Sequence, residues 1–360
     1  MATGFAQWGN DLYSGRRSYD IVGRRRTWYV ITAALVAISG VLLITPGLNP
    51  GIEFRGGSEF VVSGVETSDQ QLATDTVLAV APQEVPRVTT VGGSSLRIQT
   101  AELTSDEVTE VTNGLIAAFD VSEDQVTSTF IGPTWGRDVS QKAVTGLVVF
   151  LLFVSLVMTV YFRNWRMAAA AMLALFHDLI LTVGIYAAVG WEVTPATVIG
   201  FLTILGYSIY DTVVVFDKVR ENTVDTLDQT RFTYAEKANL AVNQTLVRSI
   251  NTSVVALLPV ASILVIGAFI LGAGTLRDIA LALFVGMFVG TFSSIFLATP
   301  LEVTLREREA RVKAHTTKVL AARTGTVVDG EPVAAAPRAV AALRPGSHQG
   351  TAAQPKRKGR

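Results

Sequence analysis

One apolar stretch of this sequence, residues 203–222 (TILGYSIYDTVVVFDKVREN), carries an aspartate, Asp211, well inside its apolar run. The stretch is long enough to cross most of a bilayer, where an ionised carboxylate costs about 3 kcal/mol even on insertion scales. Thr203, Tyr207 and Asp211 follow one another at intervals of four residues, with Ser208 beside that line, so one helix face is predicted to be polar. We expect this face to look into a helix bundle or a water-filled cavity, where Asp211 can load and release a proton.

A counter-charge for Asp211 is expected from Arg248, which lies where another apolar run begins, in QTLVRSINTS. The polar residues Asn251 and Ser253 follow it, and they favour a polar seam between the two spans. The alternative is an interfacial arginine whose long side chain reaches back to the lipid headgroups.

The adjacent pair His177 and Asp178 lies midway along a further apolar run, in ALFHDLILT. Two ionisable residues in hydrocarbon are costly, and histidine is suited to proton transfer near neutral pH. A proton relay is one interpretation of the pair, and a mutually satisfied polar contact between helices is the other.

Four charged residues end the 203–222 stretch, and we interpret them as a solvated helix end with pairing three or four residues apart: Asp217, Lys218, Arg220 and Glu221. The sequence has no cysteine, and it contains no phosphate loop, no HExxH or GxSxG pattern and no carboxylate dyad in a soluble segment. We therefore expect no enzyme, no cofactor and no metal site.

The composition is that of a membrane protein, because 49% of the 360 residues are hydrophobic and the mean hydropathy is +0.41. Six apolar runs predict six transmembrane helices, at residues 28–44, 144–162, 167–189, 195–216, 250–271 and 279–301. The short loops alternate between those with Lys or Arg and those without, which predicts that both termini are cytoplasmic. Small residues in the sixth run are interpreted as a helix contact: Gly286, Gly290, Ser293 and Ser294.

A soluble segment, residues 47–139, separates the first two spans and is expected to lie outside the cytoplasm. It is predicted to open with a strand kinked by glycines (GIEFRGGSEFVVSGVE) and to continue with a helix capped by Ser68. A hairpin around Gly92-Gly93, a second helix capped by Thr104 with Glu107, and a last strand at 125–131 complete the order βαββαβ. This order predicts an extracytoplasmic α+β ferredoxin-like domain, which carries fourteen acidic residues against four arginines.

The two ends of the chain are polar. Residues 1–26 are expected to form a cytoplasmic N-terminus, and three arginines precede the first span (27–46), which we interpret as an anchor and not as a cleaved signal. Spans two to six fall within 140–305. The tail, 306–360, is basic and is predicted to be largely disordered after a short helix (LREREARVKAH). Attraction to the membrane surface or contact with the ribosome or RNA are the two interpretations of that charge.

The sequence GYSIYDTVVVFDKVREN resembles the SecF family of protein-export membrane subunits, a branch of the resistance–nodulation–division (RND) transporters. The resemblance runs from about Tyr19 to Leu305, and it includes GIEFRGG, FHDL, VRSINTS and LFVGMFVGTFSSIFLATPL. Glu53 stands where the family usually has aspartate. The residues that match the family's motifs are Gly51, Glu53, Phe54, Gly56, Gly57, Gly206, Asp217, Arg220, Glu221, Asn222, Asn251 and Ser253.

The resemblance implies a multi-pass subunit of the bacterial cell membrane that pairs with SecD and uses the proton-motive force to promote export of polypeptides through the SecYEG channel. YidC and YajC are further partners that it implies, and no nucleic acid is expected. By position, Asp211 is the proton-carrying acid and Arg248 its partner, with Tyr207, Ser208 and the His177–Asp178 pair along the pathway. A second subunit is expected to cover the polar seam.

Two other functions are compatible with an intramembrane acid. One is an RND-type exporter of small molecules or lipids, although a single-chain exporter should carry two six-span halves. The other is a non-transporting scaffold that holds translocon components together. A scaffold would not need Asp211, and the free-energy cost of placing this carboxyl group in an apolar span argues against it. The residues do not distinguish a proton from a sodium ion as the coupling ion.

Overall fold

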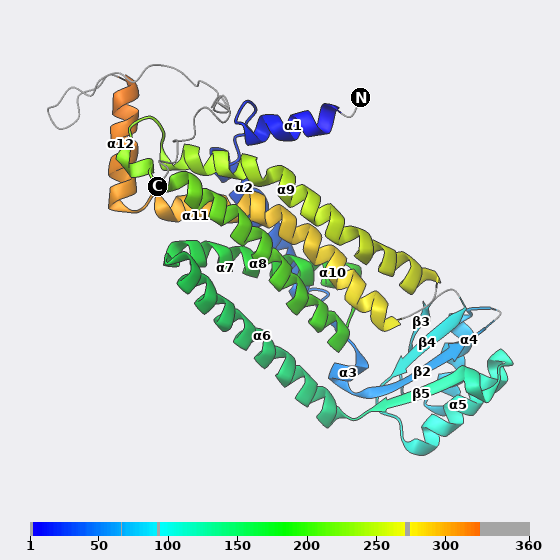
Figure 1. The fold of residues 1–360 in the computed structure, drawn as a ribbon. Coiled ribbons are helices and arrows are strands. Elements are labelled where there is room, and N and C mark those ends of the chain that lie inside the picture. Colours follow the sequence, from blue (N-terminus) through cyan, green and yellow to red (C-terminus); the bar gives the residue numbers. More distant parts are fainter. Residues whose placement is uncertain (1–2, 66, 92–93, 271–273, 325–360) are drawn as a thin grey trace, which may run out of the picture.

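Six helices, each long and apolar enough to cross a membrane, make up most of the chain (Figure 1). The computed structural model describes residues 3–65, 67–91, 94–270 and 274–324, and the six spans lie within that part. They are α2 (Arg25–Ile44), α6 (Pro133–Phe162), α7 (Trp165–Val189), α8 (Pro195–Thr223), α9 (Tyr234–Ser262) and α10 (Gly274–Ser293). The polytopic helical fold predicted from hydropathy is confirmed.

Several helices continue beyond the apolar runs that predict them. Helix α6 begins at Pro133, well before the expected start at Val144, and α8 runs on to Thr223. Helix α9 begins at Tyr234, inside a segment expected to be a connection, because Thr233 and Glu236 form a capping box there. Hydropathy marks only the apolar layer, whereas helical hydrogen bonding continues into polar ends that are capped.

Two spans change their helical geometry near one end. Helix α9 is followed by the π-helical segment η3 (Ile263–Ile270), just after Pro259. Helix α10 passes into a second π-helical segment, η4 (Ser294–Ala298), and then into α11 (Thr299–Arg306).

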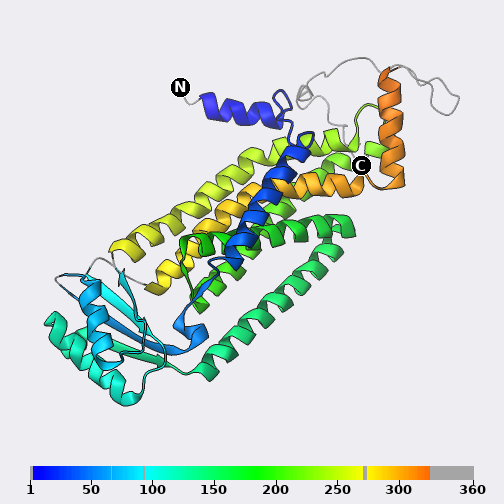
Figure 2. The ribbon, with the colours of Figure 1, turned by 180° about the vertical axis from the view of Figure 1, so that it is seen from behind.

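The spans form an inner and an outer set. About half of the most apolar window is buried in α7, α8 and α10, but only 11% in α2, α6 and α9. Small residues bring α8 and α10 together: a Cβ at Gly290 would lie 3.1 Å from the Cβ of Ser208, and one at Gly200 would lie 2.6 Å from that of Ala282. This confirms the predicted contact role of the glycines in the sixth span. Figure 2 shows α2 (blue) crossing the far side of the bundle, where it packs on α7.

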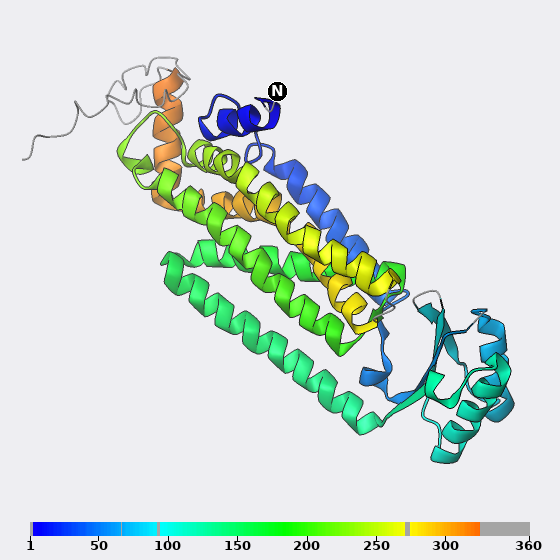
Figure 3. The same ribbon diagram turned by 45° about the vertical axis from the view of Figure 1, so that its right-hand side comes forward.

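The soluble segment between α2 and α6 folds as an α+β domain at one end of the bundle (Figure 3). Its elements are β2 (Gly57–Ser63), α4 (Gln70–Val80), β3 (Arg87–Val91), β4 (Ser95–Thr100), α5 (Ser105–Phe119), the short helix η1 (Glu123–Gln125) and β5 (Val126–Ile131). The strands pair antiparallel in the order β3-β4-β2-β5, so each helix connects two parallel strands that have a third strand between them. Phe60, Val62, Leu96 and Ile98 point from the sheet into a core with α4 and α5.

Two local predictions in this domain are wrong. The segment before Gly56 is not a strand but a helical turn, α3 (Ile52–Arg55), after which the backbone reverses through two glycines with positive φ, 82° at Gly56 and 139° at Gly57. The cap of α4 is Asp69 and not Ser68, since the Asp69 carboxylate accepts from the amides of Gln71 and Leu72. The capping box of Thr104 and Glu107 on α5 is confirmed, and the predicted Gly92-Gly93 turn lies outside the described residues.

At the opposite end of the bundle lie α1 (Thr3–Tyr13) and α12 (Ala310–Thr324), joined to it by polar contacts (Figure 3). Asn239 and Asn243 of α9 bind the backbone of residues 19–22 that follows α1. Helix α12 packs near the short helix η2 (Thr226–Asp228), where His315 bonds the carbonyl of Gln229 and Arg323 makes an ion pair with Glu236. Helix α12 continues to Thr324, past His315 where the predicted short helix ends, so the prediction of disorder is wrong for residues 316–324; residues 325–360 lie outside the described residues.

Candidate functional site

Asp211 lies on the face of α8 that turns into the bundle, and only 3% of its surface is exposed. Its Oδ1 accepts a hydrogen bond of 2.9 Å from the Ser249 hydroxyl on α9. Its Oδ2 is buried and has no hydrogen-bond partner among the described residues. A buried carboxylate oxygen without a donor is costly when the group is ionised, whereas a protonated carboxyl presents only a hydroxyl there.

The second buried acid, Asp178 on α7, is fully engaged by its neighbours. Its Oδ2 accepts a short hydrogen bond of 2.5 Å from Ser208, and its Oδ1 lies 3.0 Å from His177 Nδ1. The Nε2 of His177 is buried without a partner in the described part of the chain. Because Ser208 and Asp211 lie three residues apart on α8, both acids meet the same helix face.

A row of hydroxyl groups extends this polar region along α9 and α10. Ser253 lies 2.7 Å from Thr291 of α10, and Tyr207 of α8 donates to Ser253 over 3.4 Å. Thr212 lies 3.1 Å from Ser294, the first residue of the π-helical segment η4. π-Helical turns occur often at functional sites, and this one places Ser294 opposite the helix turn that carries Asp211. We call these groups the polar seam: Asp178, Ser208, Asp211, Thr212, Ser249, Ser253, Thr291 and Ser294.

The polar seam is closed within this chain. Ser208, Asp211, Ser249, Ser253 and Ser294 are all buried between α7, α8, α9 and α10. These five side chains are therefore enclosed by helices of this chain itself, whereas a second subunit was expected to cover them; Thr291 of the seam is half-buried.

Arg248 acts on the Asp211 carboxyl only through its charge, since no hydrogen bond or ion pair joins the two within the described residues. It is exposed and lines a cavity of about 1320 Å³ between α1, α8 and α9, together with Lys218, Gln244 and Asn251. Ser249, the next residue, takes the place next to Asp211 that the sequence analysis gave to Arg248. Successive helix residues point about 100° apart, which is why the two side chains face different surroundings.

Of the polar seam, Ser249, Thr212 and Thr291 were missed in the sequence, whereas Ser253 was expected there. On α9, Thr245, Ser249 and Ser253 recur every four residues and are buried, so their spacing was a usable signal for the inner face. On α8, Thr203 is exposed and its hydroxyl bonds back to Ile199, so it lies outside the seam that it was expected to begin. Thr212 carried no signal, since short hydroxyl residues are common in membrane helices, and Ser294 was predicted only as part of a helix contact.

The charged end of α8 behaves as a helix end with local pairing. Lys218 and Glu221 form the predicted pair three residues apart, at 2.7 Å, while Arg220 is exposed. Asp217 accepts from Tyr161 of α6, and Asn222 donates to Gln244 of α9, so these two motif residues join α8 to its neighbours. Gly206 is exposed, and a Cβ there would meet no atom within 4 Å; nothing in the structure explains it.

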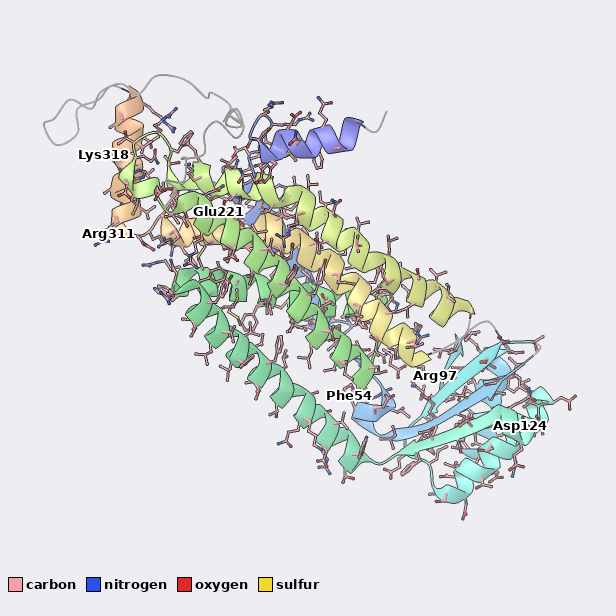
Figure 4. The ribbon with its side chains drawn as sticks, viewed as in Figure 1. Phe54, Arg97, Asp124, Glu221, Arg311 and Lys318 are labelled. Carbon is pink, nitrogen blue, oxygen red and sulfur yellow. The ribbon has the colours of Figure 1, made fainter. Side chains whose placement is uncertain are left out.

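The GIEFRGG segment forms the junction between the α+β domain and the helices. The amide of Gly51 bonds the carbonyl of Val193, and Phe54 packs on the apolar cluster at that end of α7, α8 and α10. A Cβ at Gly57 would collide with the carbonyl of Thr100, which explains the glycine. Figure 4 labels Phe54 and Arg97 at this junction.

Glu53 is the acid of that segment, and its Oε2 is buried without a hydrogen-bond partner in the described residues. Burial raises the pKa of the Glu53 carboxyl above its ordinary value of 4.5, and the nearby Glu192 and Glu59 raise it further, against Arg97. Glu53 is thus a half-buried acid with one buried oxygen, at the end of the bundle that carries the α+β domain.

Comparison with known proteins places these features in a family. The profile described as protein export membrane protein SecD/SecF, C-terminal, matches residues 111–308, and that of the SecD/SecF GG motif matches residues 41–64. The protein translocase subunit SecF of Streptomyces coelicolor is 47% identical over 323 residues, covering 90% of this chain and 86% of that protein. SecF of Mycobacterium tuberculosis is 44% identical, covering 87% of this chain and 72% of that protein.

A solved structure shares the fold. The crystal structure of SecDF from Thermus thermophilus, described as a translocon-associated membrane protein, matches with a TM-score of 0.69 and 29% identity over 81% of this chain. This chain spans only 39% of that longer SecDF chain. The two family profiles, the SecF relatives and the shared architecture show that the chain belongs to the SecD/SecF family of protein-export membrane proteins.

Proposed function

We propose that this chain is an accessory subunit of the Sec protein translocase that uses the proton-motive force to promote polypeptide export, and that it is not an enzyme. The observation that carries the proposal is Asp211: a carboxyl group inside an apolar bundle, with one oxygen bonded by Ser249 and the other free to hold a proton. Intramembrane acids of this kind mark ion paths.

The two neighbouring residues Ser249 and Arg248 suggest how the site alternates. With Ser249 beside it, Asp211 is accommodated as a neutral carboxyl. A rotation of α9 by about 100° would replace Ser249 by Arg248, whose guanidinium would pair with the ionised carboxylate. The cavity that Arg248 lines opens to solvent beside α1, and it offers the proton a way out once the carboxylate forms.

A SecD partner is supported by the SecDF relatives, in which a chain about twice as long includes a region like this one. The faces of α2, α6 and α9 are apolar and little buried, so they provide contact area for another membrane subunit. In this arrangement both termini are cytoplasmic and the α+β domain is outside. SecYEG, with YidC and YajC, and the translocating polypeptide are the further partners of this role.

The test is export into inverted membrane vesicles that carry this chain as their only SecF-type subunit, with its SecD partner. Asp211→Asn is expected to reduce gradient-stimulated export to the level of vesicles lacking the chain. Asp225→Asn, an exposed acid in the α8–α9 connection, is the matched control and should export normally. Unchanged export by the Asp211→Asn vesicles, at equal protein level, would overturn the proposal.

Other results of the same experiment point elsewhere. Stimulation by a sodium gradient alone would identify sodium as the coupling ion. Loss of export on deletion of residues 47–139, with full export by Asp211→Ala, would indicate a scaffold. Transport of a small molecule by the purified chain alone would indicate an exporter.

A further inference from the structure

We infer that Glu192 is the positioning residue through which the α+β domain and the Asp211 site are coupled. The inference rests on the proposed function and names the contact that would transmit motion between the domain and the proton site. Glu192 lies in the two-residue strand β6 (Glu192–Val193), immediately before α8, the helix that carries Asp211.

On the domain side, Glu192 is held by two side chains of β4. Gln99 donates to Glu192 Oε1 over 2.7 Å and also to Glu59 Oε2 over 3.0 Å. Arg97 forms two ion pairs: its Nη1 lies 3.5 Å from Glu192 Oε2, and its Nε lies 3.5 Å from Glu59 Oε2. The three charged side chains are only 14–17% exposed, so their interaction is less screened than that of a surface pair.

On the bundle side, Glu192 is tied to the beginning of α8. Thr194 is the N-cap of α8, and its hydroxyl also donates to Asp278 of α10 over 3.1 Å. The hydroxyl of Tyr186 on α7 reaches the Asp278 carbonyl over 3.4 Å. A movement of Glu192 therefore acts on the first turn of α8. Asp211 lies about 26 Å further along this continuous helix.

The backbone supplies a second attachment at the same place. The strand β1 (Asn49–Pro50) pairs in parallel with β6, and the Gly51 amide donates to the Val193 carbonyl over 2.9 Å. A Cβ at Gly51 would lie 3.0 Å from Glu192 Oε1, so the backbone at Gly51 packs closely against the Glu192 side chain. The Gly51 amide therefore reports whether the domain and α8 are docked.

The charges of the junction are unbalanced. Three carboxylates, Glu53, Glu59 and Glu192, surround one guanidinium, that of Arg97, and Glu53 Oε2 has no donor within the described part of the chain. Arg277 lies nearby on α10, but it is paired with Asp278. Arg97 is therefore shared among these carboxylates, and its ion pair with Glu192 is the charged part of a junction that also contains the Gln99 hydrogen bond and the β1–β6 pairing.

The experiment uses the reciprocity of coupling, measured as hydrogen exchange of the Gly51 amide in the full complex with its SecD partner. Asp211→Asn imitates the protonated site, and it is expected to change the Gly51 exchange rate about 5-fold or more in the otherwise native chain. In a Glu192→Ala background, the same Asp211→Asn change should alter the Gly51 exchange rate by no more than about a factor of two. A change of that size is expected when two sites are not coupled. Glu110→Ala, an exposed acid on α5, is the matched control and should leave the 5-fold effect in place.

Two further variants separate coupling from loss of structure. Glu192→Gln keeps a hydrogen-bond acceptor for Gln99 but removes the charge that faces Arg97, and it is expected to give an intermediate effect. If Glu192→Ala abolishes Gly51 protection altogether, Gln99→Ala serves in its place. An undiminished Asp211 effect in these backgrounds overturns the inference. It does so independently of export, whereas normal export by Asp211→Asn overturns the proposed function itself.

Discussion

Ser249 of α9 donates a 2.9 Å hydrogen bond to the Asp211 carboxylate of α8, while Arg248, one residue earlier, faces the cavity beside α1. Helix α9 thus presents the neutral hydroxyl of Ser249 to the acid. The Arg248 guanidinium lies on the same helix, about 100° around its axis. The proton site is therefore best described as a contact between two helices whose relative rotation decides which residue meets the acid.

Ser249→Ala is predicted to impair gradient-stimulated export several-fold. It removes the donor that Asp211 Oδ1 has within the described part of the chain, and leaving a buried acceptor unsatisfied costs about 1–3 kcal/mol. Ser249→Thr keeps the hydroxyl and should retain most of the activity. The comparison variant is Thr252→Ala, whose hydroxyl bonds only the backbone of its own helix at the cavity. Equal export by Ser249→Ala and Thr252→Ala would mean that the Ser249 contact is incidental.

Glu53→Gln is predicted to stabilise the folded chain at neutral pH, with a gain that disappears in acid. Because burial raises the pKa of the Glu53 carboxyl, the folded state holds its proton at pH values where the unfolded chain has released it. Ionised Glu53 therefore destabilises the fold above its folded pKa, and it contributes nothing below its ordinary value of 4.5.

This prediction is checked by thermal unfolding of the full chain in detergent between pH 4.5 and 8, as the difference between the Glu53→Gln variant and the native chain. Glu110→Gln, which changes an exposed acid, controls for the altered net charge. A difference that stays constant across the pH range would contradict the assignment of a raised Glu53 pKa.

Gly57→Ala is predicted to disrupt the docking of the α+β domain, whereas Gly206→Ala should not. Gly57 has φ of 139°, and a Cβ there would collide with the Thr100 carbonyl, so strand β2 must shift. Gly206 is an exposed helix residue with open space beside it, so alanine is expected to stabilise α8 by about 0.5–1 kcal/mol. Limited proteolysis around residues 51–60 reports the difference; equal cleavage of both variants would refute the steric argument.

Thr104→Ala is predicted to lower the stability of the α+β domain by about 1 kcal/mol, because it removes the capping box of α5. Thr109→Ala, which removes a hydroxyl that bonds the Ser105 carbonyl on the same helix, is the matched control with little expected effect. The measurement is the hydrogen exchange of α5. Gradient-stimulated export should be retained, since the Thr104 side chain bonds Glu107 of α5 and no residue of the seam or the junction among the described residues.

The sequence predicted those features that depend on residue type alone and missed those that depend on which way a helix faces. Asp211, the six spans and the Thr104 capping box follow from hydropathy and local spacing. Charge alone favours Arg248 as the partner of Asp211, yet the burial of Thr245, Ser249 and Ser253 shows that the neighbouring face of α9 turns inward.

Other differences arise from contacts between distant segments. The short helix α3 forms where Phe54 packs onto the bundle, a contact that local β propensity in GIEFRGG does not reveal. The closure of the polar seam depends on Gly290 meeting Ser208 across α8 and α10, which are more than eighty residues apart in the sequence. Their glycines indicated a contact but not its partner.

The central claim is that Asp211 itself takes up and releases a proton, and infrared difference spectroscopy of the complex with its SecD partner tests it most directly. The difference between the spectra of the native and Asp211→Asn complexes, which cancels the bands of all other carboxyl groups, is predicted to show one protonated-carboxyl band that appears and disappears with pH. Identical spectra of the two complexes at every pH would contradict the account.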